Sequence, residues 1–165
     1  MASASQARAE APPCDKRRVT FGTIQIPETA KRLIMEALDS TRISSGRLVR
    51  QFEDRFAELV DAPAAVAVSS GTDADILALA LLKDFGARIG DEVITPALSF
   101  VATGNAVIHA GFTPVFVDVD RSTLNLDPAR IEAAITPRTR AILAVHLMGK
   151  PAEMDAIQAI ADRHG

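Results

Sequence analysis

The stretch VAVSSGTD, residues 66–73, joins a short apolar run to a polar turn, and a largely apolar segment follows it. From it we predict a buried strand over residues 64–68 and a helix over residues 74–85 that is buried on nearly all sides. The first N–H groups of such a helix have no partner within the helix, and the helix dipole is positive at that end. Because Gly71 lets the backbone approach a ligand closely, the turn can bind a phosphate group.

The turn by itself leaves a second interpretation open. Serine, threonine and aspartate are residues that cap helix N-termini, and the turn contains them at Ser69, Ser70, Thr72 and Asp73. Short glycine motifs also match by chance often. The local sequence therefore predicts a strand–turn–helix unit, with either a phosphate site or a simple cap at its turn.

The rest of the chain repeats this alternation of strand and helix. Amphipathic helices are predicted before the opening stretch, over residues 27–38 and 48–60, with a turn at residues 43–46 between them. After it, strands are predicted over residues 92–95, 113–119 and 141–145, and helices over residues 100–110, 129–135 and 153–164. Strands that alternate with helices of this length favour right-handed crossovers and a parallel sheet. We therefore predict an α/β fold with three layers, a mostly parallel sheet with helices on both faces.

The two ends of the chain suggest its domain organisation. Residues 1–18 have no periodic pattern and are expected to form a flexible N-terminal arm. Residues 19–165 are expected to form one domain. Its last predicted helix ends at Gly165, where a crossover helix would normally lead into another parallel strand. We therefore expect residues 19–165 to be an incomplete large domain, the front part of a longer protein.

Composition excludes several classes of function. The formal net charge is −3, which argues against an electrostatic nucleic-acid binder. No apolar run approaches the length of a membrane span. Cys14 is the single cysteine, so no disulfide framework can form within the chain, which suits a reducing compartment. The expected location is cytoplasmic, without nucleic-acid or membrane partners.

Motifs for nucleotides and metals are weak or absent. No G-x-G-x-x-G sequence follows a predicted strand, and Gly149-Lys150 lacks the other residues of a phosphate-binding P-loop. The histidines have no metal-ligand spacing, so no metal site is predicted from them. Asp118 and Asp120 could bind a divalent metal with a nucleotide diphosphate, as in many glycosyltransferases. We favour the alternative that they cap the turn after their strand.

Six blocks of sequence carry a specific resemblance when they are taken in order. They are residues 70–74, 90–96, 99–103, 114–120, 131–137, and 145–149 together with 151–157. Their sequence and spacing resemble the DegT/StrS-type sugar aminotransferases, which are pyridoxal phosphate enzymes of fold-type I. The resemblance extends from about Phe21 to Gly165.

The resemblance implies roles for several residues of this chain. Gly71, Thr72 and Asp73 match the turn that binds the phosphate of pyridoxal 5′-phosphate through backbone N–H groups and a hydroxyl. Phe100 matches the aromatic residue that stacks on the pyridine ring, although core packing at a helix start would also explain a phenylalanine there. Asn105 and His146 match positions near the cofactor pocket, where either could instead cap a neighbouring loop. The family does not use its acidic pair at residues 118 and 120 as a metal site.

The resemblance also places the reacting groups of the family outside this sequence. The Schiff-base lysine, and the aspartate that pairs with the pyridine nitrogen, are expected beyond Gly165. None of the lysines at positions 16, 31, 83 and 150 fits the place of that lysine. We therefore expect no catalytic residue in this chain, and no activity from the 165 residues alone.

For the complete protein, the resemblance implies a homodimeric aminotransferase. Its expected reaction moves an amino group, with glutamate as the expected donor, to a keto group of a nucleotide-linked sugar. Two alternatives stay open at this point. One is a pyridoxal phosphate-dependent sugar dehydratase of the same family, in which a histidine replaces the lysine. The other is a non-catalytic binding or regulatory module that has the same fold.

Overall fold

The computed structural model describes residues 24–41 and 44–165, which fall into two units divided between Leu48 and Val49. The first unit contains α1 (Glu28–Asp39), which confirms the helix predicted there. The helix starts one residue later than predicted, because Pro27 is its N-cap residue and has extended backbone angles. The predicted arm at residues 1–18 and the start of the turn at residue 43 lie outside the described residues.

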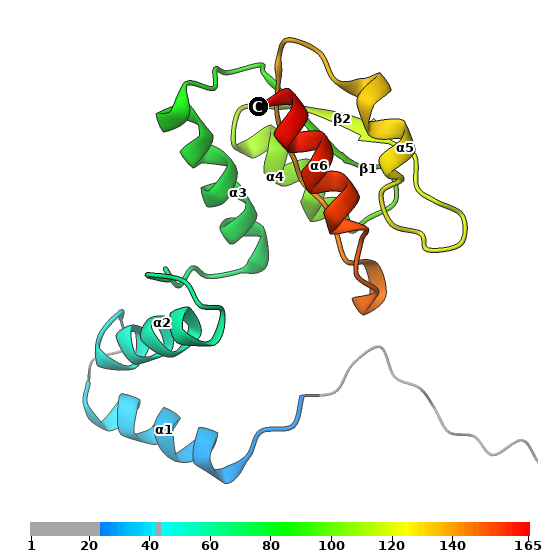
Figure 1. Cartoon of the computed structure of the whole chain (residues 1–165). Helices are drawn as coiled ribbons and strands as arrows, with labels where there is room; N and C mark the ends of the chain where they lie inside the picture. The colour runs from blue at the N-terminus through cyan, green and yellow to red at the C-terminus, as the bar shows by residue number, and fades with distance from the viewer. Residues whose placement is uncertain (1–23, 42–43) are drawn as a thin grey trace, which may run out of the picture. The chain divides into compact units, whose positions relative to one another are not determined.

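The second unit begins within α2 and contains all the strands described (Figure 1). Its α-helices are α2 (Arg47–Leu59), α3 (Gly71–Leu81), α4 (Val101–His109), α5 (Pro128–Ile131) and α6 (Met154–His164). Its strands are β1 (Glu92–Pro96), β2 (Thr113–Val117) and β3 (Thr139–Ile142). Short 3₁₀ turns are η1 (Leu82–Phe85), η2 (Glu132–Ala134) and η3 (Leu147–Gly149).

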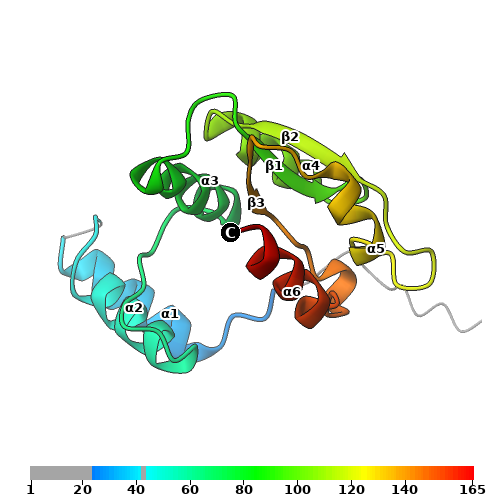
Figure 2. The same cartoon turned by 45° about the horizontal axis from the view of Figure 1, so that its top comes forward.

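The sheet has three strands in the order β2-β1-β3, and β1 is parallel to both of its neighbours. Ile94 at the centre of β1 lies opposite Val115 of β2 and Ile142 of β3. The β1–β3 register shifts after Glu92, which pairs with Thr139. Because the strands are parallel, their carboxyl ends lie at one edge of the sheet, where α/β proteins commonly bind ligands. Figure 2 shows β1 and β2 side by side.

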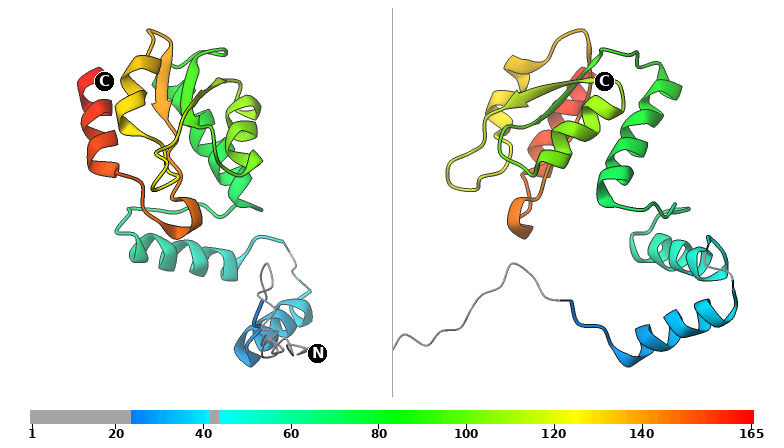
Figure 3. Two further views of the ribbon diagram at one scale, coloured as in Figure 1. Left: turned by 90° about the vertical axis from the view of Figure 1, so that its right-hand side faces the viewer. Right: turned by 180° about the vertical axis from the view of Figure 1, so that it is seen from behind.

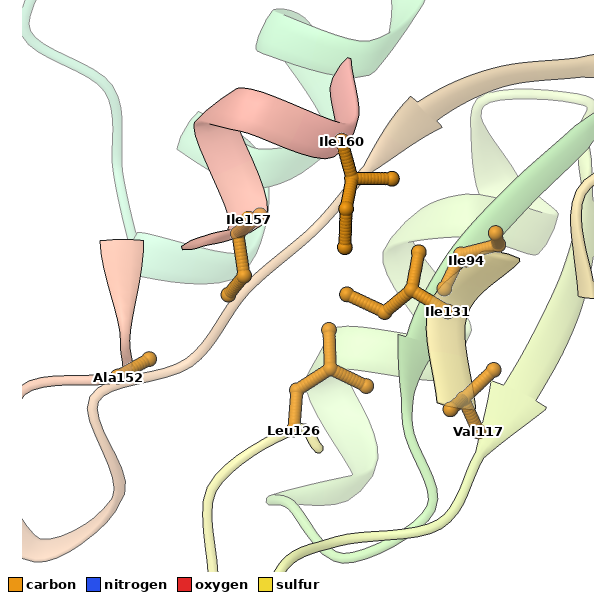
Figure 4. Packing of buried hydrophobic residues seen from close by; sticks show 7 residues of the cluster. All are labelled: Ile94, Val117, Leu126, Ile131, Ala152, Ile157 and Ile160. Atoms are coloured by element: carbon orange, nitrogen blue, oxygen red, sulfur yellow. The ribbon is translucent and has the colours of Figure 1, made fainter. Parts of the chain in front are cut away.

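One face of the sheet is covered by α5 and α6. Buried residues from β1, β2, α5 and α6 pack together there, with further contributions from the loops (Figure 4). They are Ile94, Val117, Leu126, Ile131, Ala152, Ile157 and Ile160. Ile94 and Ile131 have no exposed surface, so this cluster is closed to water at its centre.

The opposite face is covered by α3 and α4, so the second unit has three layers (Figure 3, left). Its buried cluster is formed by Leu79, Val93, Ala106, Val107, Ala110 and Phe112. Val93 and Ile94 are neighbours on β1 and join opposite clusters, as the alternation of side chains along a strand requires. The α/β fold with a parallel sheet and helices on both faces is confirmed.

The strand predicted at residues 64–68 is not formed in the structure. The chain is extended between α2 and α3, but no strand within residues 24–41 and 44–165 pairs with this segment. The amide N–H of Ala67 donates instead to the carboxylate of Glu53 on α2, at 2.9 Å. Val66, predicted to be buried, has 72% of its surface exposed. A strand needs a partner for its backbone groups, and the described residues supply none.

The predicted helix at residues 74–85 is also revised. It starts earlier, at Gly71, and its last turn is the 3₁₀ segment η1. Leu79 is its one fully buried residue, whereas Leu77 and Leu81 are exposed, so burial on all sides is wrong for this structure. An apolar helix of this kind has surface left to pack against further chain.

Strand boundaries differ from prediction by a few residues. β2 ends at Val117, after which Val119 forms an isolated bridge with Leu126. β3 was predicted over residues 141–145 but covers Thr139–Ile142. The polar residues at the start of β3 bind two buried acidic residues, one on β1 and one in the loop before β1. Sequence periodicity does not detect such long-range contacts.

Those acids are Asp91 and Glu92, at the amino edge of the sheet. Arg140 Nε donates to Asp91 at 2.7 Å, and Thr136 Oγ1 donates to Glu92 at 2.6 Å. Arg138 also pairs with Glu92. These hydrogen bonds lower the pKa of Asp91, chiefly through Arg140, and the pKa of Glu92, chiefly through Thr136. The two acidic residues thus connect β1 to β3 at the amino edge of the sheet.

Candidate functional site

The helices α3 and α4 run in the same direction on one face of the sheet. Near their C-terminal ends, Gly90 N–H donates to the carbonyl of Gly111 at 2.9 Å. Lys83 Nζ lies 5.7 Å from the centroid of the Phe112 ring in the same region. These contacts adjoin the amino ends of β1 and β2. The N-termini of α3 and α4 therefore lie toward the carboxyl edge of the sheet.

The N-terminus of α3 is a capped turn. Ser70 is the N-cap, and its Oγ accepts from the backbone N–H of Asp73 at 3.1 Å. The Asp73 carboxylate in turn accepts from the hydroxyls of Ser69 and Ser70, the latter at 2.9 Å. The capping interpretation of this turn is therefore realised. Capping uses one of the first helical N–H groups and leaves others available.

The available groups are the N–H groups of Gly71 and Thr72. Neither has a hydrogen-bond partner in the part of the chain that the structure describes. A Cβ added at Gly71 would meet no atom within 4 Å, so the space beside this residue is open. Two unpaired donors at the positive end of a helix, next to open space, fit a phosphate group.

Asp73 sets the electrostatics of the turn. Hydrogen bonds from Ser69, and then from Ser70, lower the pKa of its carboxyl group. The ionised carboxylate is stabilised at a helix N-terminus but repels another anion there. Asp73 also donates its own N–H to Ser70, so its part in the turn is to hold the two serines while Gly71 and Thr72 stay open.

Phe100 lies at the carboxyl end of β1, where it is the N-cap residue of α4. Its side chain is 77% exposed, so it does not pack into the core. The following turn is fixed by a 2.8 Å hydrogen bond between the hydroxyls of Ser99 and Thr103. A ring held on a rigid helix start, with its surface free, is able to stack on a flat ligand.

Asn105 and His146 differ in how they are held. Asn105 is an exposed residue within α4, and no described side chain or backbone group is hydrogen-bonded to its amide. His146 follows β3 at the carboxyl edge, and its Nδ1 accepts from the backbone N–H of Ala152 at 3.0 Å. His146 therefore caps its own loop, as the alternative interpretation expected.

Sequence reasoning missed Asn125, which is 97% buried. Its side-chain amide makes three hydrogen bonds to the loop after β3, through the N–H of Leu147 and the carbonyls of Lys150 and Pro151. The one signal in the sequence is a polar residue between two leucines, Leu124 and Leu126. An asparagine in that setting is ordinary in a turn, so its reach across the sheet edge could not be inferred.

The acidic pair after β2 caps a turn. Asp120 Oδ1 accepts from the backbone N–H of Ser122 and of Thr123, both at 2.9 Å. Asp118 accepts from the N–H of Val119. The Ser122 hydroxyl also donates to Asp120, at 2.5 Å, and it is the largest cause of the lowered pKa of Asp120, followed by the N–H groups of Thr123 and Ser122. Within the described ranges, no group of His, Cys, Asp and Glu is placed to hold a metal ion.

The helices that the structure describes are all too short or too polar to span a lipid bilayer.

A family model matches residues 25–165, and its description is the DegT/DnrJ/EryC1/StrS aminotransferase family. Among curated proteins, the spore coat polysaccharide biosynthesis protein SpsC of Bacillus subtilis is 52% identical over 132 residues, which is 80% of this chain and 33% of SpsC. GDP-perosamine synthase of Caulobacter vibrioides is 42% identical over 151 residues, covering 91% of this chain and 40% of that protein. The chain thus spans about a third to two-fifths of their length.

Solved structures of similar sequence also match this chain over most of its length. DesV of S. venezuelae superposes with a TM-score of 0.76 at 45% identity, over 84% of this chain and 36% of DesV. GDP-4-keto-6-deoxy-D-mannose-3-dehydratase of E. coli, solved with bound hydrated PLP, has a TM-score of 0.73 at 37% identity. That match covers 80% of this chain and 35% of the dehydratase.

Proposed function

The chain belongs to the DegT/DnrJ/EryC1/StrS aminotransferase family, and from this we propose that its protein is a pyridoxal phosphate-dependent sugar aminotransferase. The proposed reaction transfers an amino group from glutamate to a keto group of a nucleotide-linked sugar. The observation that carries the proposal is the pair of unpaired N–H groups at Gly71 and Thr72, beside open space, on the same side of the sheet as the exposed Phe100.

Each of these residues has a binding task in the proposed site. Gly71 and Thr72 would donate their backbone N–H groups to the cofactor phosphate, and the Thr72 hydroxyl would add a further donor. Asp73 would keep Ser69 and Ser70 in place around them. Phe100 would stack on the pyridine ring and limit its tilt. Asn105 and His146 are proposed to border the same pocket.

When bound, pyridoxal phosphate supplies an electron sink and carries the amino group between donor and acceptor. This chain contributes binding and orientation, and we propose that it holds no catalytic residue. The lysine that binds the cofactor covalently, and the aspartate facing the ring nitrogen, are proposed to follow Gly165. On this proposal, residues 19–165 form the first part of a cofactor-binding large domain, and the 165 residues alone are inactive.

The assembly and location are proposed as a cytoplasmic homodimer. A single cysteine and the absence of an apolar run of membrane length support the location. Apolar surface on α2 and α3 supports an assembly with further chain, because Phe52, Leu59 and Leu81 are exposed.

The reaction is tested with glutamate labelled with ¹⁵N and a nucleotide-linked keto sugar as substrates, using the protein as its gene encodes it. We expect the label to appear in the sugar product, with formation of 2-oxoglutarate. A protein that binds the cofactor and converts the sugar without retaining nitrogen would contradict amino transfer.

That contradictory result would support the second candidate, a sugar dehydratase. The observation in its favour is the 37% identity with the E. coli dehydratase. We propose that the matched region holds none of the reacting groups. Because the two reactions share the binding residues described here, the products distinguish them and the cofactor site does not. A protein without any cofactor affinity would indicate a non-catalytic module.

A further inference from the structure

Asn125 closes a turn at the carboxyl edge of the sheet. Its Nδ2 donates to the carbonyls of Lys150 and Pro151, each at 3.0 Å, and its Oδ1 accepts from the N–H of Leu147 at 3.0 Å. The amide thus binds both ends of the turn formed by residues 147–151. The three bonds satisfy a side chain that is otherwise removed from water.

The turn needs such a clasp because its backbone is strained. Met148 has a φ of 54° and Gly149 a φ of 80°. Positive φ suits glycine but is unfavourable for methionine, and such residues persist where the surrounding structure holds them. The Met148 side chain is almost fully exposed, so packing does not supply the constraint. The three bonds from Asn125 supply it together with two backbone bonds inside the turn, from Gly149 N–H to the His146 carbonyl at 3.1 Å and from Lys150 N–H to the Leu147 carbonyl at 3.0 Å.

The clasp fixes the two ends of a second hydrogen bond. His146 directly precedes the clasped turn, and Ala152 directly follows it. Ala152 N–H donates to His146 Nδ1 at 3.0 Å. A ring nitrogen that accepts a hydrogen bond carries no proton, so neutral His146 has its proton on Nε2. No described residue accepts a bond from Nε2, and the His146 residue is exposed.

His146 lies at the same edge of the sheet as the proposed cofactor site. β3 is the direct neighbour of β1, and the chain leaves both strands at the same edge of the sheet. The start of α4 at Phe100 follows β1, and the clasped turn follows β3. The Nε2–H group of His146 is thus an oriented, unused donor at this edge.

We propose that Asn125 is a positioning residue, which clasps residues 147–151 and thereby holds His146 as an Nε2–H hydrogen-bond donor to bound pyridoxal phosphate. The inference rests on the proposed function for the identity of the ligand. The role of Asn125 is indirect, since it acts through His146 and touches no ligand itself.

The first test measures the clasp without any cofactor. Nitrogen NMR of the His146 ring at alkaline pH reports which nitrogen carries the proton, and amide hydrogen exchange reports the Ala152 N–H. In Asn125→Ala we expect the His146 ring to populate both tautomers. We also expect the Ala152 N–H to exchange at least tenfold faster, which corresponds to about 1.4 kcal/mol less protection. The control is Glu92→Gln, which weakens the opposite edge of the sheet and should leave both readouts unchanged.

If Asn125→Ala does not fold, Asn125→Asp replaces it. The aspartate keeps the acceptor for Leu147 N–H but cannot donate to Lys150 and Pro151 when ionised. The same two changes are expected, because the aspartate oxygen that replaces Nδ2 is repelled by both carbonyls. An unchanged tautomer and unchanged exchange at Ala152 in a folded variant would overturn the clasp.

The second test measures binding of pyridoxamine phosphate, which has an amine in place of the aldehyde and binds without a covalent bond. We expect Asn125→Ala and His146→Ala each to weaken binding by about tenfold. Because Asn125 acts through His146, the double variant should be no weaker than His146→Ala. Additive losses would overturn the positioning role.

The two tests separate this inference from the proposed function. If the wild-type protein does not bind pyridoxamine phosphate, the proposed function fails, and the His146 donor loses its ligand with it. If the wild type binds but His146→Ala binds equally well, the proposed function stands and the inference is overturned.

Discussion

The open space beside Gly71 makes a single methyl group informative. In Gly71→Ala, the added Cβ meets no protein atom within 4 Å, so the fold should be unaffected. The methyl would instead enter the space proposed for the phosphate. We expect binding of pyridoxamine phosphate to weaken by about tenfold, measured by calorimetry, with no loss of thermal stability.

The matched ligand for this test is pyridoxamine, which lacks the phosphate. Its affinity should be the same for the wild type and Gly71→Ala. If Gly71→Ala weakened the binding of both ligands equally, the added methyl group would lie against the ring, which would contradict the assignment of this space to the phosphate.

Phe100 gives a second prediction at this scale. Because its side chain is mostly exposed, Phe100→Ala should change the free energy of unfolding by less than about 0.5 kcal/mol. Loss of ring stacking should weaken cofactor binding by about two- to tenfold, and Phe100→Tyr should retain it. Equilibrium titration with pyridoxamine phosphate measures both. Destabilisation by Phe100→Ala without loss of affinity would indicate packing instead.

Among the elements, α5 depends on its N-cap. Asp127 accepts from the N–H of Ala129 at 3.0 Å, and Pro128 occupies the first helical position. Asp127→Ala should lower the free energy of unfolding by about 1 kcal/mol, whereas Asp127→Ser should keep most of it. Denaturant unfolding measures the difference. Equal losses for the two variants would show that the Arg130 ion pair with Asp127, and not the cap, is the source.

The amino edge of the sheet predicts a dependence on pH. Asp91 and Glu92 have pKa values below the ordinary 3.8 and 4.5 because Arg140 and Thr136 hydrogen-bond to them. Groups with a lowered pKa in the folded state stabilise it fully above the ordinary values, and that stabilisation is lost as pH falls through the folded values.

We therefore expect unfolding free energy to be flat between about pH 5 and 7 and to fall below about pH 4.5. Glu92→Gln should reduce the steepness of that fall, because glutamine does not titrate. Denaturant unfolding at a series of pH values measures both curves. Parallel curves for the wild type and Glu92→Gln would contradict the role of Glu92.

Local patterns predicted the elements whose partners lie within the described chain. The start of α5 at Asp127-Pro128 and the end of α4 before Gly111 were readable from capping chemistry alone. The conformation of residues 64–68 could not be predicted in this way. A strand requires a neighbouring strand, and the apolar pattern of this segment does not show whether one is present. The early start of β3 reflects ion pairs with residues about 46 to 49 positions away, which no local pattern contains.

At the scale of the whole molecule, the order of the six sequence blocks identified the family, and the fold agrees with it. The positions of Gly71 and Phe100 at the carboxyl edge follow from the alternation of strands and helices. Asn125 could not be assigned, since its three bonds join the turn after β2 to the loop after β3. Only the folded chain brings those two loops together.

We propose that this protein is a pyridoxal phosphate-dependent aminotransferase whose reacting lysine lies beyond Gly165. The direct measurement is a peptide map of the protein isolated from its natural source, after reduction with borohydride to fix the cofactor covalently. We expect a phosphopyridoxyl group on a lysine beyond Gly165. A map with no modified lysine, or with the group on one of the lysines at positions 16, 31, 83 and 150, would contradict it.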